Sequence, residues 1–172
     1  FEVRLLSREG KNALSASGAD EVSFVMSANA GEALGPISRI ASGGELSRIM
    51  LALKNVFAEK DGVDALIFDE IDTGVSGVAA QRVAEKLASL GRTKQVLCVT
   101  HLPQIAAMAQ QQYLVEKAEH GGRTYTNILL LDREGRRYEL ARLSGGDMIT
   151  DIQLAGAEEL LARDERFRAS LS

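Results

Sequence analysis

The alternation of apolar and polar positions divides the chain into strands and helices. Strands are predicted at residues 1–6, 21–28, 65–68, 95–99, 113–116 and 124–131. The runs at 65–68 and 95–99 are short and apolar, which is typical of strands buried on both faces. The last two strands are expected to form a hairpin through residues 120–122. Residues 29–38 hold two glycines and a proline and favour a loop.

Apolar residues at a spacing of three to four predict helices between these strands. The first predicted helix begins at Ser42, and two others cover residues 77–90 and 103–109. The last runs from Thr150 or Asp151 to about Arg163. The order strand, helix, strand, helix from 65 to 109 implies parallel strands with right-handed crossovers. We therefore expect an α/β fold with a mostly parallel sheet flanked by helices and an antiparallel strand portion.

Composition indicates a globular chain and argues against some functions. Its 172 residues, 45% apolar and 26% charged, suit one domain with a sizeable core. A net charge of −4 and a pI near 5.3 argue against bulk electrostatic binding of nucleic acid by this chain. Arginines gather at 133–142 and 163–168, but interspersed acids favour a solvated face. The single cysteine, Cys98, excludes an internal disulfide and suits a reducing compartment.

The sequence holds no apolar run long enough to span a bilayer and no basic and apolar leader. We therefore expect a cytoplasmic protein without a membrane partner. The chain starts directly in a strand-like pattern, as it would if it began midway through a domain.

A glycine-rich segment, Ser-Gly-Gly-Glu, starts the first long helix. Ser42 and Glu45 have the spacing of a capping box, in which each side chain binds the other residue's backbone N–H. Gly43 and Gly44 weaken a helix start, but the absence of side chains lets a ligand approach the backbone closely. The free N–H groups at a helix start attract anions. A helix cap and a phosphate site are both consistent with the motif. The similar run at 143–147 has no amphipathic helix directly after it, and is interpreted as a turn before the last helix.

Acidic residues follow the first buried strand. Asp69 and Glu70 stand where ligands of α/β sheets gather, and buried strands rarely end in paired carboxylates because desolvating acids is costly. Asp69 can hold Mg²⁺ through water, and Glu70 can orient or deprotonate an attacking water. Asp72 lies in the loop that follows. The alternative is a solvated turn, which the glycine-rich helix start makes the weaker interpretation.

A histidine follows the second buried strand. An imidazole at His101, beside the acidic strand end, can donate to a γ-phosphate, although a lone histidine is more often structural. His120 is interpreted as a surface residue and Cys98 as core packing. One part of a nucleotide-hydrolysing site is missing, because the sequence holds no G-x-x-x-x-G-K-[ST] phosphate loop. Its one Gly-Lys pair, Gly10-Lys11, is not followed by Ser or Thr.

Three blocks resemble the ABC-type ATPases and, more closely, the RecN family of DNA repair proteins, which are relatives of SMC and Rad50-type proteins. The blocks are IASGGELSRIMLALK at 40–54, FDEIDTGVSG at 68–77 and THLPQIAAMA at 100–109. Glu45 and Ile71 stand where transporter domains usually carry Gln and Pro. The resemblance extends from about Asp20 to Leu161 and is weak at residues 1–19 and in the tail.

The resemblance implies that residues 1–172 are the C-terminal half of an ATPase head, with signature motif, Walker B acids, D-loop and His switch. ATP and Mg²⁺ are the implied cofactors. The implied site consists of Glu70 and His101 as catalytic residues, Asp69 at the metal, and Ser42, Gly43, Gly44, Glu45 and Asp72 at the nucleotide. The signature segment would reach ATP held by a second head.

The implied partners are an N-terminal half with the Walker A lobe and a long coiled coil, a second head in an ATP-dependent homodimer, and DNA through the full-length protein. The implied role is double-strand break repair at the nucleoid, with ATP hydrolysis by the assembled head and almost none by this chain alone. Two alternatives stay open: a head of another SMC, Rad50 or RecF type, and a non-catalytic module that keeps the signature only as a dimerising surface. An upstream phosphate loop followed by long heptads would favour the first interpretation.

Overall fold

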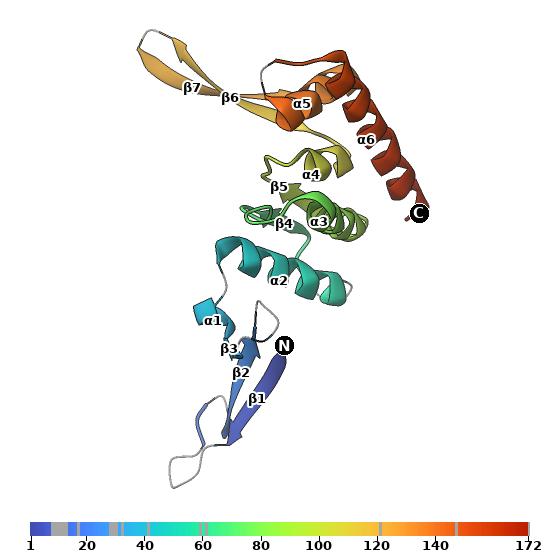
Figure 1. Cartoon of the computed structure of the whole chain (residues 1–172). Helices are drawn as coiled ribbons and strands as arrows, with labels where there is room; N and C mark the ends of the chain where they lie inside the picture. The colour runs from blue at the N-terminus through green and yellow to red at the C-terminus, as the bar shows by residue number, and fades with distance from the viewer. Residues whose placement is uncertain are drawn as a thin grey trace.

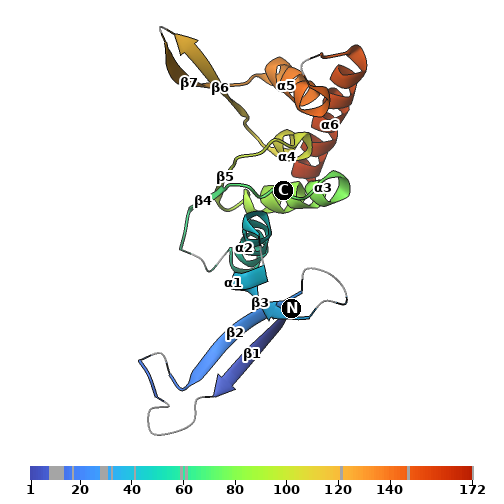
Figure 2. The ribbon, with the colours of Figure 1, turned by 60° about the vertical axis from the view of Figure 1, so that its left-hand side comes forward.

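The elements follow one another along the axis of an elongated molecule, in nearly their order in the sequence (Figures 1 and 2). The structure is a computed structural model and describes residues 1–7, 14–16, 18–27, 31, 33–40, 42–58, 60, 62–120, 122–146 and 148–171. Its elements are β1 Glu2–Ser7, β2 Asp20–Met26, β3 Gly35–Pro36, α1 Ile37–Ile40, α2 Gly43–Phe57, β4 Ala65–Phe68, α3 Gly77–Leu90, β5 Gln95–Cys98, α4 Pro103–Met108, β6 Tyr113–His120, β7 Arg123–Leu130, α5 Arg133–Gly145 and α6 Asp151–Ser170. Gly10, Lys11, Gly121 and Asp147, which entered the predictions above, lie outside the described residues.

The N-terminal sheet is antiparallel, with strand order β1-β2-β3. The two long strands are confirmed, but the predicted loop at 29–38 is partly wrong. Gly35 and Pro36 form the edge strand β3 against Val25 and Met26, where a proline without an N–H is tolerated, and α1 follows at once. One face of β1 and β2 is apolar and exposed; it carries Phe1, Val3, Leu5, Val22 and Phe24.

The central part pairs β4 with β5 in parallel, in register from Ala65–Gln95 to Phe68–Cys98, as the strand-helix-strand order predicts. One face of this pair packs on α3 and α4 in the first hydrophobic core. The core residues are Leu51, Phe68, Ile71, Ala84, Leu87, Leu90, Ile105 and Met108. The expectation of strands buried on both faces is wrong for the described chain, because Ile67, Leu97 and Val99 on the other face are 75%, 49% and 63% exposed.

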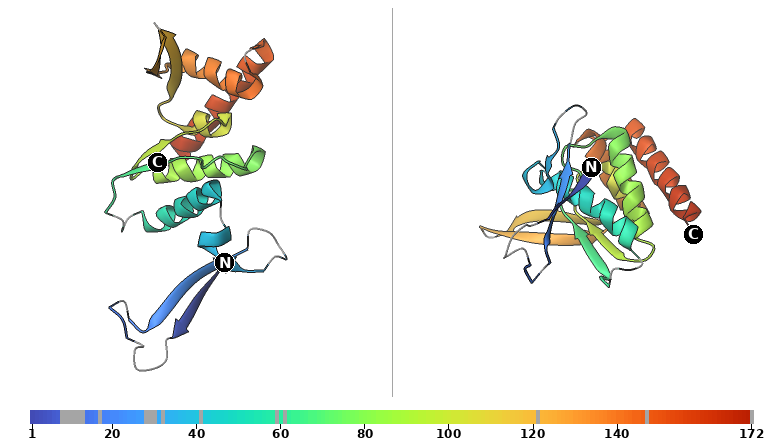
Figure 3. Two further views of the ribbon diagram at one scale, coloured as in Figure 1. Left: turned by 90° about the vertical axis from the view of Figure 1, so that its left-hand side faces the viewer. Right: turned by 90° about the horizontal axis from the view of Figure 1, so that it is seen from below.

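The short helix α4 joins this core to a second one formed with α5 and α6, because its Ile105 and Met108 lie in the first cluster and its Ala106 and Ala107 in the second. Helix α6 runs back to α3, which places the C-terminus beside that helix (Figure 2). The β6–β7 hairpin is antiparallel as predicted and projects away from the helices (Figure 3).

Helix α5 was not predicted, and the interpretation of its arginines as a solvated face is wrong for Arg136. This side chain is 8% exposed and donates to the carbonyl oxygens of Ala107 and Ala109 at 3.2 and 2.8 Å. Arg168 of α6 donates to the carbonyl oxygens of Ala107 and Met108. The two guanidinium groups therefore bind the unpaired carbonyl groups at the C-terminus of α4, where the helix dipole favours positive charge.

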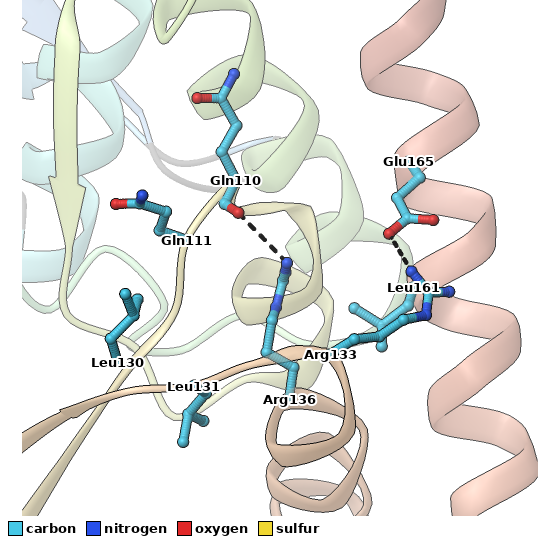
Figure 4. Close-up of a pocket in the computed structure, with 8 residues that line it drawn as sticks. All are labelled: Gln110, Gln111, Leu130, Leu131, Arg133, Arg136, Leu161 and Glu165. Carbon is cyan, nitrogen blue, oxygen red and sulfur yellow. Dashed lines mark hydrogen bonds and ion pairs between the residues drawn. The ribbon is translucent and has the colours of Figure 1, made fainter.

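A cavity of about 310 Å³ lies beside Arg136 (Figure 4). Its wall includes Arg133, which forms ion pairs of 2.6 Å with Glu158 and Glu165 of α6. The charge of Arg133 therefore holds α5 to α6, whereas that of Arg136 is used at the end of α4, and none of the predicted nucleotide residues lines the cavity. Among the described residues, no helix has both the length and the apolar character needed to cross a membrane.

Candidate functional site

The second turn of α2 holds the loop that follows β4. Ser47 Oγ donates to the carbonyl oxygen of Asp69 at 3.0 Å, and Arg48 Nη1 donates to those of Ile71 and Thr73 at 3.1 and 2.7 Å. The signature block and the acidic block, about twenty residues apart in the sequence, are thus one structural unit. No sequence pattern indicates the role of Arg48, because its partners are main-chain carbonyl groups more than twenty residues away in the chain.

The predicted capping box is confirmed at the start of α2. The Ser42 N–H donates to Glu45 Oε2 at 2.8 Å, and the Glu45 N–H donates to Ser42 Oγ at 3.4 Å. The hydrogen bond from the Ser42 backbone, followed by the one from its hydroxyl, lowers the pKa of the Glu45 carboxyl. Both side chains therefore stabilise the helix start.

The two glycines of this motif allow the acidic loop to approach α2. A Cβ on Gly44 would lie 2.9 Å from the carbonyl oxygens of both Glu70 and Thr73, and one on Gly43 would lie 2.8 Å from Glu70 Oε2. The first clash is with backbone atoms and the second with the end of a side chain. The close approach that these glycines serve in this chain is therefore that of the loop carrying Glu70, which the sequence could not distinguish from that of a ligand.

Asp69 and Glu70 lie at the carboxyl end of β4, as predicted, and both residues are exposed. Glu70 has a φ of +56°, and no other non-glycine residue in the described ranges has a positive φ. A left-handed backbone at such a residue is strained by about 1–3 kcal/mol, and strain of this kind concentrates at functional sites. The Glu70 N–H donates to Asp69 Oδ1 at 2.9 Å, which holds the two acids side by side.

Asp72 connects the ends of β4 and β5. It is 4% exposed, and its Oδ2 accepts hydrogen bonds from Thr100 Oγ1 at 2.6 Å and the His101 N–H at 2.9 Å, while His101 Nδ1 lies 3.0 Å away. Burial alone would raise the pKa of Asp72, but the hydrogen bonds from Thr100 and His101 outweigh it and the pKa is lowered. The structure thus places the Asp72 carboxylate against Thr100 and His101, and its role at the nucleotide stays a prediction.

The donor set fits Mg²⁺ only in combination with a phosphate. The described residues contain no group of three or more acidic, cysteine or histidine side chains that could enclose a metal ion. Mg²⁺ is commonly held by one or two carboxylates plus water and substrate phosphates, and the exposed Asp69 carboxylate meets that need. Cys98 packs against the first core, and burial raises the pKa of its thiol to about 12, which disfavours the thiolate form.

The fold is similar to that of a solved SMC ATPase structure. A solved structure concerned with ATP-driven dimerization and DNA-stimulated activation of SMC ATPases matches 85% of this chain and 83% of its own, with a TM-score of 0.50 and 18% sequence identity. No family model matches the chain.

The more specific relationship is with the DNA repair protein RecN, to whose C-terminal part this chain is similar. It is 46% identical to RecN of Halalkalibacterium halodurans over 94% of this chain, 51% identical to that of Vibrio cholerae over 84%, and 41% identical to that of Bacillus subtilis over 99%. The chain spans 29%, 26% and 31% of these relatives, which is less than a third of each.

Proposed function

We propose that this chain is part of the ATP-binding and ATP-hydrolysing head of a RecN-like protein that acts in DNA double-strand break repair. The observation that carries the proposal is Asp72, which ties the end of β4 to the end of β5. Because of this link, the two exposed acids and His101 lie at the same edge of a parallel pair, where ligands of α/β folds bind.

In this proposal each residue has a distinct task. Asp69 would hold the Mg²⁺ that accompanies ATP, and this ion would neutralise part of the phosphate charge. Glu70 takes a proton from the attacking water or orients it, and His101 contacts the γ-phosphate region. Ser42, Gly43 and Gly44 present the start of α2 to the nucleotide of a second head, so that ATP joins two heads and its hydrolysis releases them.

The open surfaces of the chain support an N-terminal half as its partner. Its accessible surface is 11854 Å², against about 8,200 Å² expected for a compact monomer of this mass. Parallel strands are ordinarily covered on both faces, yet Ile67, Leu97 and Val99 leave one face of β4 and β5 open. We infer that the part of the protein that supplies the phosphate loop also covers this face, and that the chain alone hydrolyses almost no ATP.

A non-catalytic dimerising module is the second candidate. It is favoured by the exposed start of α2 in a sequence that holds no phosphate loop. The sequence relationship favours RecN over SMC, Rad50 or RecF types for either candidate.

Glu70→Gln in the full-length protein separates the candidates. An ATPase head loses its base but keeps its shape, so we expect hydrolysis to fall roughly a hundredfold or more and ATP-bound dimers to accumulate in light scattering. A non-catalytic module would show the same dimerisation and the same background hydrolysis with or without the substitution. Near-normal hydrolysis by Glu70→Gln would assign Glu70 a structural role.

Ser42→Arg tests the contact between two heads. Mixed with Glu70→Gln heads, it should form weaker ATP-dependent dimers than Glu70→Gln heads form alone, because one of the two interfaces is blocked. Ser144→Arg is the matched control, since Ser144 is also an exposed serine before two glycines. Normal dimerisation and hydrolysis by Ser42→Arg would reduce the motif to a helix cap.

A further inference from the structure

We propose that Arg48 is the positioning residue of Glu70. Its guanidinium group holds the main chain of the loop after β4, and this loop determines where the Glu70 carboxylate lies. The inference rests on the proposed function for its effect on hydrolysis, whereas the contacts from which it is argued do not depend on that function. Arg48 stands in the second turn of α2, the helix whose start carries the glycine-rich motif.

One nitrogen of the guanidinium group binds two carbonyl groups of the loop. Arg48 Nη1 donates to the carbonyl oxygens of Ile71 at 3.1 Å and of Thr73 at 2.7 Å. This nitrogen carries two N–H groups, so it can serve both acceptors at once. Hydrogen bonds from a charged donor are stronger than those between neutral groups, and Arg48 is half-buried. The side chain therefore restricts the main chain on both sides of Asp72.

The peptide groups nearer to Glu70 are held as well. The carbonyl oxygen of Asp69 accepts a hydrogen bond from Ser47 Oγ at 3.0 Å, and that of Glu70 accepts one from the Thr73 N–H at 3.1 Å. Ser47 thus holds the peptide group directly before Glu70, while Arg48 holds carbonyl groups that follow it. Two neighbouring side chains of α2 enclose Glu70 from both directions along the chain.

The backbone of Glu70 requires such support. Its φ of +56° is strained for a residue with a side chain, and a strained backbone persists only where the surrounding structure fixes it. Glu70 is exposed, so core packing does not hold its own side chain, whereas the next residue, Ile71, is fully buried. If the loop relaxed to an ordinary φ, the Glu70 carboxylate would point in another direction. The contacts of Arg48 therefore maintain the direction in which Glu70 presents its carboxylate.

Hydrogen exchange measured by mass spectrometry of the full-length protein tests the structural part. Arg48→Met removes the donors but keeps an unbranched side chain that suits a helix. Exchange in the segment 70–75 should become about tenfold faster or more, because its turns lose their support. Exchange in the segment 86–94, at the end of α3, should not change. Arg82→Met is the matched control, since Arg82 is an exposed arginine that pairs with Glu85 within α3, and it should leave the segment 70–75 unchanged. Unchanged exchange at 70–75 in Arg48→Met, or equal acceleration in both segments, would overturn the proposal.

The kinetic test asks whether Arg48 acts through Glu70. In the full-length protein, Arg48→Met should lower kcat about tenfold or more with KM for ATP little changed, because a displaced catalytic group loses rate rather than binding. Arg48→Lys keeps the charge and the donors on a shorter side chain and should restore part of the loss. In the Glu70→Gln background, where the base is already absent, Arg48→Met should lower the single-turnover rate by less than about twofold.

The outcomes separate this inference from the proposed function. An equal loss of rate from Arg48→Met with and without Glu70→Gln would show that Arg48 acts independently of Glu70, and would refute the positioning role. A normal kcat in Arg48→Met would refute it as well. Near-normal hydrolysis by Glu70→Gln alone would instead remove Glu70 from the proposed reaction, and the exchange experiment would still decide whether Arg48 holds the loop.

Discussion

Two segments with the same three residues, Ser-Gly-Gly, occupy opposite ends of helices in this molecule. The segment at 42–44 starts α2, and Ser42 caps it. The segment at 144–146 ends α5, where the Ser144 hydroxyl donates to the Leu140 carbonyl and the Gly146 N–H donates to that of Arg142. A helix start presents N–H groups and a helix end presents carbonyl groups, so only the first can attract an anion.

The glycines of the two segments also meet different neighbours. At 43 and 44 they allow the acidic loop to approach, whereas a Cβ on Gly145 would meet the side-chain amide of Gln153 in α6. Gly146 has a φ of +81°, which favours glycine by conformation rather than by proximity. The same three residues therefore allow close contact between two motifs at 42–44, and a change of chain direction at 144–146.

The largest difference is expected between Gly44→Ala and Gly145→Ala. At Gly44 the added carbon would lie 2.9 Å from two backbone oxygens, and we expect a loss of about 2–3 kcal/mol in the free energy of unfolding. At Gly145 only the flexible end of Gln153 must move, although this side chain also caps the start of α6 together with Thr150. The better helix propensity of alanine should offset the loss of that cap, so the net change should stay within about 1 kcal/mol.

Denaturant unfolding of the chain measures both variants. Gly156→Ala is the control, because Gly156 is exposed in the interior of α6 with nothing within 4 Å of an added Cβ. It should stabilise the chain by about 0.5–1 kcal/mol. If Gly44→Ala were as mild as Gly145→Ala, the close packing of the loop on α2 would not be what requires glycine at that position.

Gly43→Ala should affect the rate more than the stability. Its added carbon would lie 2.8 Å from Glu70 Oε2, and the carboxylate can move where a backbone cannot. A catalytic group displaced by about 1 Å can lose up to a hundredfold in rate. With Glu70 in its proposed role, the full-length protein should hydrolyse ATP with a kcat about tenfold lower. A normal kcat together with strong destabilisation would reverse the assignments of Gly43 and Gly44.

The sequence predicts those elements whose own residues carry a periodic pattern of apolar positions. Residues 77–90 form α3 as predicted, with Gly91 as its C-cap. β4 ends at Phe68, directly before the two acids, and β5 ends at Cys98, shortly before His101. Helix α5 escaped prediction because its mean hydropathy is low and its burial depends on Arg136, whose partners are carbonyl groups far away in the sequence. Arginine is ordinarily a surface residue, so no local pattern reveals such a contact.

The sequence predicts the residues of the candidate site but not the contacts among them. The spacing of motifs indicated Asp69, Glu70 and His101, because chemistry at strand ends has a recognisable order. Thr100 binds a buried carboxylate and Arg48 binds main-chain carbonyl groups, and only the folded chain brings these partners near them. The exposure of one face of β4 and β5 could not be predicted either, because the sequence of an apolar strand does not indicate which segment of the protein covers it.

The smallest expected effect separates the two helix starts by pH. The box at α2 uses Glu45, whereas the box at α6 joins Thr150 to Gln153, whose amide does not titrate; the Thr150 N–H donates to Gln153 Oε1 at 2.8 Å. The pKa of Glu45 is lowered in the folded chain, so its stabilisation of α2 is complete above the ordinary value of 4.5 and is lost as the pH falls through the lowered pKa.

An acid titration of amide shifts by ¹H–¹⁵N spectra, from about pH 6 to about pH 3, should therefore move the Ser42 signal and leave that of Thr150 in place. Glu45→Gln is the matched control, since glutamine also completes a capping box but carries no proton to gain. In that variant the Ser42 signal should become as insensitive to pH as that of Thr150. If the two signals moved together in the unsubstituted chain, acid would be loosening the whole molecule rather than the start of α2.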